Sequence, residues 1–275
     1  MTNLDYKMES HGFVHIKNVF PRKSIEIVSN YLQQIDFNEK SIEYNNISYD
    51  DKNGIIKDLK CETIGMKDYL VGYNFNVNSD QRTVIQMYYT GLDGDAGDVP
   101  NPYLGKLCSN DTMRNVKQFS RRNKQMIENI LSQTNELYPY LSKYPKHDYT
   151  KLFINEPGCK DQELHCDDPE DIEREKMYII IPLNDCDTDM GTTIFYDANH
   201  VGKYLTNDES WYNKGPLENL NGKIKEDFQL AEYNVPFQIG DAVLFFGDSV
   251  HRGTCNRSDK NRLFLHLAFR DHSRP

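Results

Sequence analysis

The most regular alternation of hydrophobic and other side chains lies near the end of the chain, over residues 262–269. Successive side chains of a strand point to opposite sides, so this stretch predicts a strand with two distinct faces. One face is apolar and contains Leu263, Leu265, Leu267 and Phe269. The other face contains Arg262, Phe264, His266 and Ala268. We expect this second face to point inward, where the Arg262 guanidinium requires a carboxylate partner and His266 is a hydrogen-bonded core histidine.

Other short segments with strand patterns follow one another through the second half of the chain. They cover residues 151–155, 164–167, 177–183, 192–196, 233–239, 242–246 and 263–269. Many short strands separated by turn residues are typical of a double-sheet jelly roll. The expected fold class is therefore mainly β, with helical support around a jelly-roll core.

The first half of the chain predicts the supporting elements. A helix should begin near Pro21, a strand should cover residues 83–89, and a helical pattern over residues 112–144 should end at Pro145. The apolar positions of the first of these helices recur every three or four residues: Ile25, Val28, Leu32 and Ile35.

The expected organisation is one domain over residues 1–275. Residues 1–145 supply helical and strand support, and residues 146–275 form the jelly-roll core. Two irregular segments are candidate lids over a binding site, the Gly- and Asp-rich segment 91–110 and the insertion 201–232. For segment 91–110, a plain surface excursion is an equally open interpretation.

Composition narrows the partners that the protein can have. The formal net charge is −10, which argues against a surface that binds the phosphate backbone of nucleic acid. The 6 cysteines include no closely spaced pair, which indicates buried thiols in a reducing compartment. No stretch is long and apolar enough to span a membrane. We therefore expect a cytoplasmic protein that binds neither nucleic acid nor membrane, and we leave its oligomeric state open.

The most informative side chains are two histidines and an aspartate. His165 and Asp167 project to one side of their predicted strand, whereas Cys166 points away into packing. Asp168 falls on the opposite face and is expected to be a solvated carboxylate. His251 follows a distant apolar strand and can complete the group. Two imidazoles and one carboxylate on one side of a ferrous ion leave three positions open, so the pattern predicts a non-haem Fe(II) site that binds a co-substrate and O2.

These residues resemble the Fe(II)- and 2-oxoglutarate-dependent oxygenases, and within them the phytanoyl-CoA dioxygenase-like group. The match is most specific between residues 251 and 262, where His251, Asn256, Ser258 and Arg262 agree with the group in type and spacing. Weaker similarity lies at residues 11–20 and 191–200, so the resemblance covers most of the chain.

The resemblance implies a double-stranded β-helix, with His165, Asp167 and His251 as iron ligands and Arg262 as the anchor for the distal carboxylate of 2-oxoglutarate. It further implies that the enzyme attacks a C–H bond of a small-molecule substrate, by hydroxylation, desaturation or oxidative cyclisation, and releases succinate and CO2. The remaining alternatives are a peptidyl or prolyl-type hydroxylase, a cupin-like isomerase and a non-catalytic jelly-roll binding protein.

This sequence departs from the family pattern around the anchor. Many relatives have a serine two residues after the distal histidine, where its hydroxyl helps to hold the co-substrate, and here that residue is Gly253. Phe264 stands where another hydroxyl is usual, and Thr254 is the candidate replacement. Prolyl-hydroxylase-like members anchor the co-substrate with lysine, for which Lys260 is available, but Arg262 has the better register.

Four further polar residues have a structural and a functional interpretation. Lys151 and Asn155 share one strand face and could touch 2-oxoglutarate, although we expect structural roles. His147 and His200 are expected to be loop residues, the latter within reach of the mouth of the site.

Overall fold

The structure is a computed structural model that describes the following residues: 8, 10–33, 40–43, 48–50, 55–57, 62–64, 82–89, 110–162, 164–168, 174–196 and 232–271. The two candidate lids therefore lie outside the described residues except for their last positions. Asn110 begins a helix and Glu232 begins a strand.

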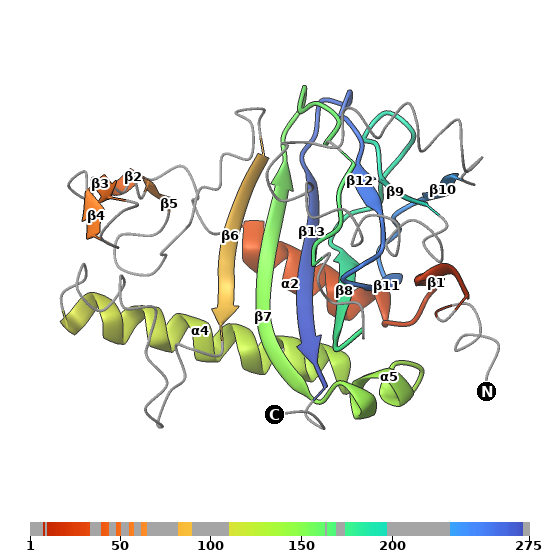
Figure 1. The fold of residues 1–275 in the computed structure, drawn as a ribbon, viewed down its shortest axis with the longest axis horizontal. Helices are drawn as coiled ribbons and strands as arrows, with labels where there is room; N and C mark the ends of the chain where they lie inside the picture. The colour runs from red at the N-terminus through yellow and green to blue at the C-terminus, as the bar shows by residue number, and fades with distance from the viewer. Residues whose placement is uncertain are drawn as a thin grey trace.

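The larger of two facing sheets is antiparallel and contains six strands (Figure 1). Their order across the sheet is β1 (Phe13–Ile16), β11 (Ala242–Phe246), β8 (Lys176–Pro182), β13 (Arg262–Arg270), β7 (Lys146–Asn155) and β6 (Arg82–Tyr89). The edge strands β1 and β6 both come from the predicted support region, as Figure 1 shows. That region therefore completes the sheet of the predicted core.

The smaller sheet contains β10 (Glu232–Val235), β9 (Thr193–Tyr196) and β12 (His251–Gly253), in that order. The predicted strand 233–239 ends at Val235 because Pro236 cannot donate a hydrogen bond to a neighbouring strand. The predicted strand 164–167 was also wrong as a regular strand. Among the described residues, it joins this sheet through an isolated bridge between His165 and His251.

Two small antiparallel sheets of two strands each lie between β1 and β6 in the chain. β2 (Lys40–Glu43) pairs with β5 (Glu62–Ile64), and β3 (Ser48–Asp50) pairs with β4 (Ile55–Lys57). Their strands are too short and too polar for the sequence pattern to predict.

Aromatic side chains fill the space between the six-stranded and the three-stranded sheet. Phe13 and Phe245 of the larger sheet both contact Phe195 of the smaller one, with ring centroids 4.7 and 5.3 Å apart. Phe195 and Phe245 are fully buried. Two antiparallel sheets packed around a shared apolar core form a jelly roll, so the predicted fold class is confirmed.

Helices cover the outer face of the larger sheet (Figure 1). They are α2 (Arg22–Gln33) and α4 (Asn110–Leu131), and the short helix α5 (Tyr138–Lys143) lies at the lower end of the sheet. Ile25 of α2 and Ile127 of α4 belong to the same buried cluster as Leu265 and Leu267 of β13. Phe264 instead belongs to the cluster between the sheets. The two faces predicted for β13 are therefore the two faces observed.

The predicted helix over residues 112–144 is in fact two helices. α4 ends at Leu131, and α5 begins at Tyr138 with Pro139 in its first turn. A proline within one continuous helix would remove a backbone hydrogen bond and clash with the preceding turn, whereas the first turn of a new helix accepts it. The end before Pro145 was predicted correctly.

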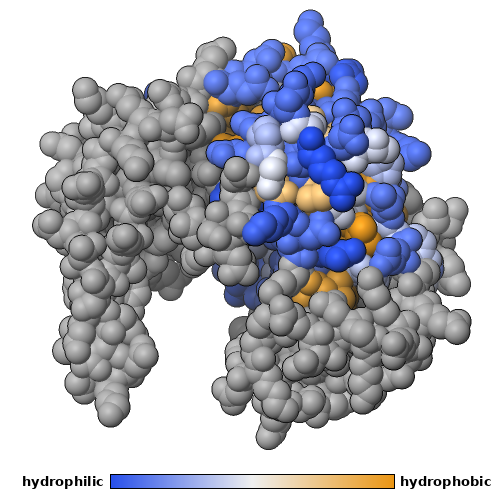
Figure 2. Space-filling view, turned by 90° about the horizontal axis from the view of Figure 1, so that it is seen from above, coloured by the Kyte–Doolittle hydropathy of each residue, from blue (hydrophilic) through white to orange (hydrophobic). Residues whose placement is uncertain are grey.

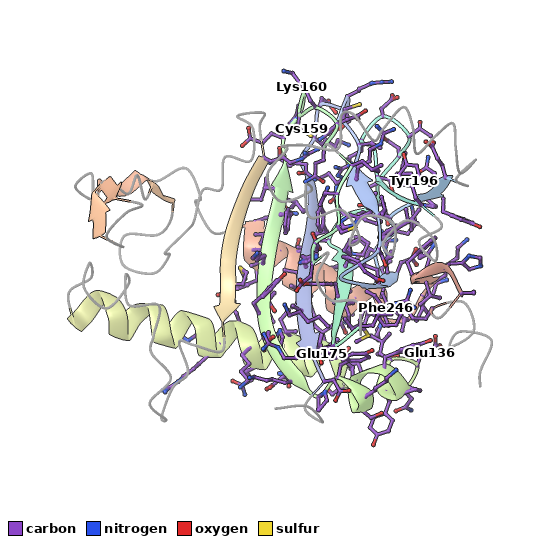
Figure 3. The ribbon with its side chains drawn as sticks, viewed as in Figure 1. Glu136, Cys159, Lys160, Glu175, Tyr196 and Phe246 are labelled. Carbon is purple, nitrogen blue, oxygen red and sulfur yellow. The ribbon has the colours of Figure 1, made fainter. Side chains whose placement is uncertain are left out.

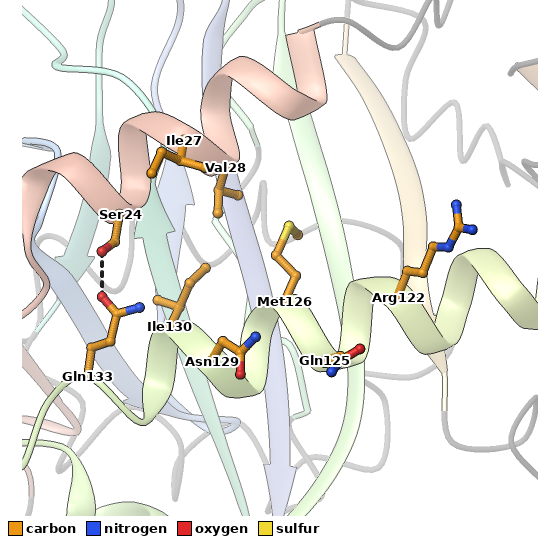
Figure 4. Close-up of a pocket in the computed structure, with 9 residues that line it drawn as sticks. All are labelled: Ser24, Ile27, Val28, Arg122, Gln125, Met126, Asn129, Ile130 and Gln133. Carbon is orange, nitrogen blue, oxygen red and sulfur yellow. Dashed lines mark hydrogen bonds between the residues drawn. The ribbon is translucent and has the colours of Figure 1, made fainter.

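A shallow groove of about 350 Å³ runs between α2 and α4 on the outside of the molecule (Figure 4). Ser24 donates a hydrogen bond to Gln133 across it, and Ile27 at its rim is 61% exposed. Ile35, predicted to continue the apolar stripe of α2, lies outside the described residues. Figure 2 shows a different face, whose described surface is mostly hydrophilic with small apolar areas.

Candidate metal and co-substrate site

The three predicted ligands His165, Asp167 and His251 come together on the inner side of the smaller sheet. One ligand atom of each lies within 4.8 Å of the other two. Asp167 Oδ1 is 3.7 Å from His165 Nε2 and 3.8 Å from His251 Nε2. The backbone bridge between His165 and His251 holds the two rings next to each other, with centroids 4.5 Å apart. Two imidazoles and one carboxylate at this spacing fit a single divalent metal ion with open coordination positions.

The protonation states suit metal binding. Burial, the largest cause, lowers the pKa of His251 to about 4, so this ring is neutral near pH 7. Its Nδ1 donates to the Ser249 carbonyl at 3.0 Å, which leaves the lone pair on Nε2. Burial acts to raise the pKa of the Asp167 carboxyl. The charge of His251, the hydrogen bond from His266 and the charges of His266 and His165 outweigh it and hold this pKa below its ordinary value.

The neighbours of Asp167 point away from the ligands, as predicted. Cys166 is buried, its Sγ lies 3.3 Å from the Asp248 carbonyl oxygen, and burial raises the pKa of its thiol. Asp168 was predicted to be a solvated carboxylate, and this is wrong. Its side chain is 21% exposed and forms an ion pair with Lys176, which enters from the neighbouring strand β8.

Two side chains of the larger sheet face the ligands. His266 of β13 is buried, and its Nε2 lies 3.1 Å from Asp167 Oδ2. Lys151 of β7 pairs in register with His266, and its Nζ lies 4.4 Å from the centroid of the Tyr149 ring. Burial lowers the pKa of Lys151, and the charge of Asp167 opposes this shift. Lys151 thus adds a half-buried amine to the metal side of the site.

Arg262 begins β13 at the end of the sheet that Cys159 and Lys160 mark in Figure 3. It is only 1% exposed. Nη1 donates to the carbonyl oxygens of Met190 and Thr192 at 3.1 and 3.3 Å, and Nη2 donates to that of Thr254 at 2.9 Å. Among the described residues no carboxylate pairs with this guanidinium.

The Arg262 guanidinium keeps donors free for a ligand. Its Nε is buried without a hydrogen-bond partner in the described part of the chain. A guanidinium has five N–H groups, so Nη2 also has a second one beyond its bond to Thr254. A carboxylate would satisfy such a pair of parallel donors, so the residues fit the distal end of 2-oxoglutarate.

Gly191 is required for this arrangement. Its φ is +74°, and a Cβ at this position would lie 2.8 Å from Arg262 Nη1 and 2.6 Å from Thr254 Oγ1. The Thr254 hydroxyl, the candidate replacement for the missing serine, is bonded to the backbone instead. It accepts from Thr192 N at 2.7 Å and donates to Thr192 O at 3.0 Å. Thr254 therefore contributes its carbonyl to Arg262 but has no hydroxyl hydrogen left for a co-substrate.

The space beside Gly253 is taken by Gln162. Gln162 Oε1 accepts a hydrogen bond from Gly253 N at 2.9 Å, and Gln162 N donates to Gly253 O at 2.8 Å. A Cβ added to Gly253 would lie 2.5 Å from Gln162 Oε1 and 3.6 Å from Arg262 Nη2. The Gln162 carboxamide and the Arg262 guanidinium therefore both lie beside the position that a side chain at residue 253 would occupy. The Gln162 Nε2 amino group has no partner among the described residues.

The other residues of the C-terminal motif build the turn between β12 and β13. Asn256 is fully buried, its Oδ1 accepts from Ser258 N and Oγ at 3.0 and 2.7 Å, and its Nδ2 donates to the carbonyl oxygens of Asn155 and Lys260. Lys260 is exposed at this turn, which is consistent with the preference for Arg262 as the anchor. The motif thus places Arg262 at the start of its strand.

Three further polar residues were given predicted roles, namely His147, His200 and Asn155. His147 is not a loop residue, because it lies in β7, is buried, and has Nε2 2.8 Å from Thr150 Oγ1. The alternation of β7 extends further towards the N-terminus than the sequence pattern indicated. His200 lies outside the described residues. Asn155 Oδ1 accepts from Arg82 Nε at 3.0 Å, so it has the structural role that was expected.

Sequence reasoning missed Gln162, and it missed that the partner of His266 is a candidate metal ligand. For His266 the signal was its place on the inner face of β13. For Gln162 there was no periodic signal, because it lies in the irregular segment between β7 and His165.

The comparisons with known proteins agree with this geometry. The sequence matches the family model for phytanoyl-CoA dioxygenase over residues 8–264. No curated protein matches the chain. Similar solved structures include SnoK, a non-haem alpha-ketoglutarate-dependent carbocyclase from nogalamycin biosynthesis, with a TM-score of 0.58 and 12% identity over 98% of this chain and 84% of that chain.

Two further structures hold ligands. The epimerase SnoN, in complex with Fe3+, alpha-ketoglutarate and nogalamycin RO, has a TM-score of 0.54 and 15% identity over 99% of this chain and 85% of that chain. HygX from Streptomyces hygroscopicus, with nickel and 2-oxoglutarate bound, has a TM-score of 0.50 and 11% identity over 99% of this chain and 88% of that chain. At these identities the similarity establishes the shared fold.

A jelly roll that brings two histidines and one aspartate to one point has the architecture of a non-haem, metal-dependent oxygenase. The family match spans nearly the whole chain, and the protein belongs to the phytanoyl-CoA dioxygenase family. It is therefore an Fe(II)- and 2-oxoglutarate-dependent oxygenase.

Proposed function

We propose that this oxygenase binds Fe(II) through His165, Asp167 and His251, holds 2-oxoglutarate at Arg262, and oxidises a C–H bond of a small-molecule substrate with release of succinate and CO2. The observation that carries this proposal is the buried Arg262 guanidinium, which keeps an unpaired Nε. Arg262 lies on the same face of β13 as His266. The two residues are four positions apart, which is roughly 13 Å along the strand at about 3.3 Å per residue, and His266 contacts the candidate ligand Asp167.

Bound Fe(II), 2-oxoglutarate and O2 together supply the oxidising power, and the protein supplies binding and orientation. The rings of His165 and His251 offer ring nitrogens as ligands, and Asp167 offers one carboxylate oxygen. Arg262 orients the co-substrate through the N–H groups that its backbone partners leave free. The Gln162 Nε2 amino group adds a second donor beside it, in place of the hydroxyl that this sequence lacks.

Apolar rings lie between the anchor and the metal ligands. Phe153 and Phe264 stack with centroids 4.9 Å apart, and Phe237 packs on Phe264 at 5.9 Å. Such rings favour the aliphatic middle of a dicarboxylate and exclude water, which strengthens the charge interactions at both ends.

The proposal extends to the setting in which the enzyme acts. A small molecule is the preferred substrate class because the net charge of −10 disfavours nucleic acid. Among the described residues, no helix is both long and apolar enough to cross a membrane. We further propose a cytoplasmic location. We also propose a single oxygenase domain, since β1 and β6 complete the sheet that contains β13.

An anaerobic titration tests this function. Purified protein is titrated with Fe(II), with and without 2-oxoglutarate, while the visible absorption is recorded. A charge-transfer band should develop only when both are present, and admission of O2 with ascorbate and a panel of small molecules should then yield succinate. Verified iron loading without the band and without succinate would contradict the proposal and favour a non-catalytic binding protein.

A further inference from the structure

The two oxygens of the Asp167 carboxylate have different partners. Oδ1 faces the ligand nitrogens of His165 and His251, at 3.7 and 3.8 Å. Oδ2 faces the other sheet, where His266 Nε2 lies 3.1 Å away. A carboxylate oxygen accepts hydrogen bonds, so His266 Nε2 is the donor in this contact.

We propose that His266 is a positioning residue for the metal site, which reserves one oxygen of Asp167 for the metal by holding the other. The inference rests on the proposed Fe(II) site and deepens it. A carboxylate restrained in this way binds a metal through a single oxygen. A freely rotating carboxylate could use both oxygens, and the second would occupy a coordination position that the co-substrate or O2 needs.

His266 is built to hold its position. It is 6% exposed, and its ring stacks on Tyr178 and Tyr149 with centroids 5.2 and 5.9 Å apart. Phe153 and Phe245 pack against it at 5.6 and 5.8 Å. Its strand is hydrogen-bonded on both sides, to β7 and to β8. Rings on several sides and a central strand leave the imidazole few alternative rotamers.

Asp167 is the only described hydrogen-bond partner of the His266 ring, because Nδ1 is buried without one. His266 does not belong to the group of side chains whose ligand atoms lie within 4.8 Å of one another. His266 therefore contacts the site through Asp167, and this geometry lets it orient the Asp167 carboxylate.

The chain offers a matched control for this interaction. His15 Nε2 lies 2.8 Å from Asp241 Oδ2, and the Asp241 side chain is 4% exposed. This is the same kind of histidine–aspartate contact at the edge strand β1, outside the metal ligand group. If breaking a buried hydrogen bond is enough to weaken Co(II) binding, substitution of either His266 or His15 should lower the Co(II) affinity. If the cause is the positioning of a metal ligand, only substitution of His266 should lower it.

The experiment compares Co(II) binding to the full chain in wild type, His266→Phe, His266→Gln and His15→Phe. Co(II) is used alone and followed by its visible absorption. Circular dichroism and thermal unfolding report the fold of each variant. His266→Phe should bind Co(II) about 10- to 100-fold more weakly with a changed visible spectrum, as is usual when a partner of a metal ligand is removed. His266→Gln keeps an N–H donor at a similar reach and should recover much of the affinity. His15→Phe should bind as wild type does.

An affinity of His266→Phe within threefold of wild type would overturn the inference. Equal losses in His266→Phe and His266→Gln would also overturn it, because the cause would then be the ring and not its N–H. If His266→Phe fails to fold, His266→Asn takes its place, because the shorter amide does not reach Asp167 Oδ2. A Co(II) affinity of His266→Asn within threefold of wild type would overturn the inference in the same way. Failure of the proposed function has a different signature, since the wild-type protein itself would then bind no Co(II).

Discussion

At the scale of single residues, function depends on which partner each polar side chain has. Asp167 and Asp168 are adjacent in sequence but lie on opposite sides of the chain. Asp167 faces two histidines and accepts a hydrogen bond from a third. Asp168 forms an ion pair with Lys176, and both side chains are partly exposed. The two acids should therefore respond differently to the same substitution.

Asp167→Ala should reduce succinate formation to background, because it leaves only two histidines for the metal. Asp168→Ala should retain turnover within about threefold and lose roughly 0–1 kcal/mol of stability, as is usual for a partly exposed ion pair. Succinate assays and chemical denaturation of both variants measure these effects. The reverse pattern, with Asp168 essential and Asp167 dispensable, would show that the ligand is misassigned.

Gln162→Glu tests the second donor proposed for 2-oxoglutarate. Glutamate keeps an oxygen that can accept from Gly253 N but replaces the Nε2 donor with a negative charge. That charge would lie beside the incoming carboxylate, so the KM for 2-oxoglutarate should rise at least about 10-fold. Co(II) affinity should change little. The control Gln238→Glu makes the same change at an exposed residue and should leave the KM unchanged. An unchanged KM for Gln162→Glu would remove Gln162 from the pocket.

At the scale of elements, helices and strands hold the site by burying one face against another layer. The inner face of β13 carries Arg262 and His266, while its outer face packs against α2 and α4. Ile25 of α2 is fully buried in that layer, whereas Ile27 on the same helix is 61% exposed. The support of the site therefore depends on one side of each helix.

Ile25→Ala should lower the free energy of unfolding by about 2–5 kcal/mol, because it opens a cavity between α2 and the sheet. Ile27→Ala makes the identical chemical change on the exposed side and should stay within about 0.5 kcal/mol of wild type. Urea denaturation of the two variants gives the comparison. Similar losses in both would mean that α2 does not dock as described.

The β7 strand gives stability a dependence on pH. Burial, the largest cause, lowers the pKa of His147 from 6.5 to about 4. As pH falls below 6.5 the unfolded chain takes up a proton that the folded protein refuses until about pH 4. Stability contributed by the neutral ring is therefore present above pH 6.5 and is lost as pH falls, by about 2 kcal/mol between pH 6.5 and 5.

Replacing His147 with glutamine removes this proton site, so the decline of unfolding free energy between pH 6.5 and 5 should become shallower by that amount. Denaturation of metal-free wild type and His147→Gln at several pH values measures the two slopes. Parallel slopes would show that His147 does not contribute.

At the scale of the whole molecule, the surface charge limits the partners. The net charge of −10 repels a phosphate backbone, and the described surface in Figure 2 is mostly hydrophilic. The protein should therefore bind neither duplex DNA nor tRNA at physiological salt in a gel-shift assay. Binding in the micromolar range that weakens with added salt would contradict this expectation.

The sequence by itself determined the fold class and the identity of the candidate ligands. Alternation over β13 assigned Arg262 to the inner face, because the period of a strand is a local property of the chain. The spacing of His165 and Asp167 and the motif that joins His251 to Arg262 are likewise readable along the sequence. Element ends were less predictable where a single residue decides them, as Pro139 does between α4 and α5.

Only the tertiary structure decided which groups meet. It paired His266 with Asp167, used the Thr254 hydroxyl for the backbone of Thr192, and set Gln162 beside Gly253. Each of these contacts joins residues that are far apart in sequence. Periodicity specifies the side to which a residue points, whereas its partner depends on how the sheets pack and on how irregular segments lie across them.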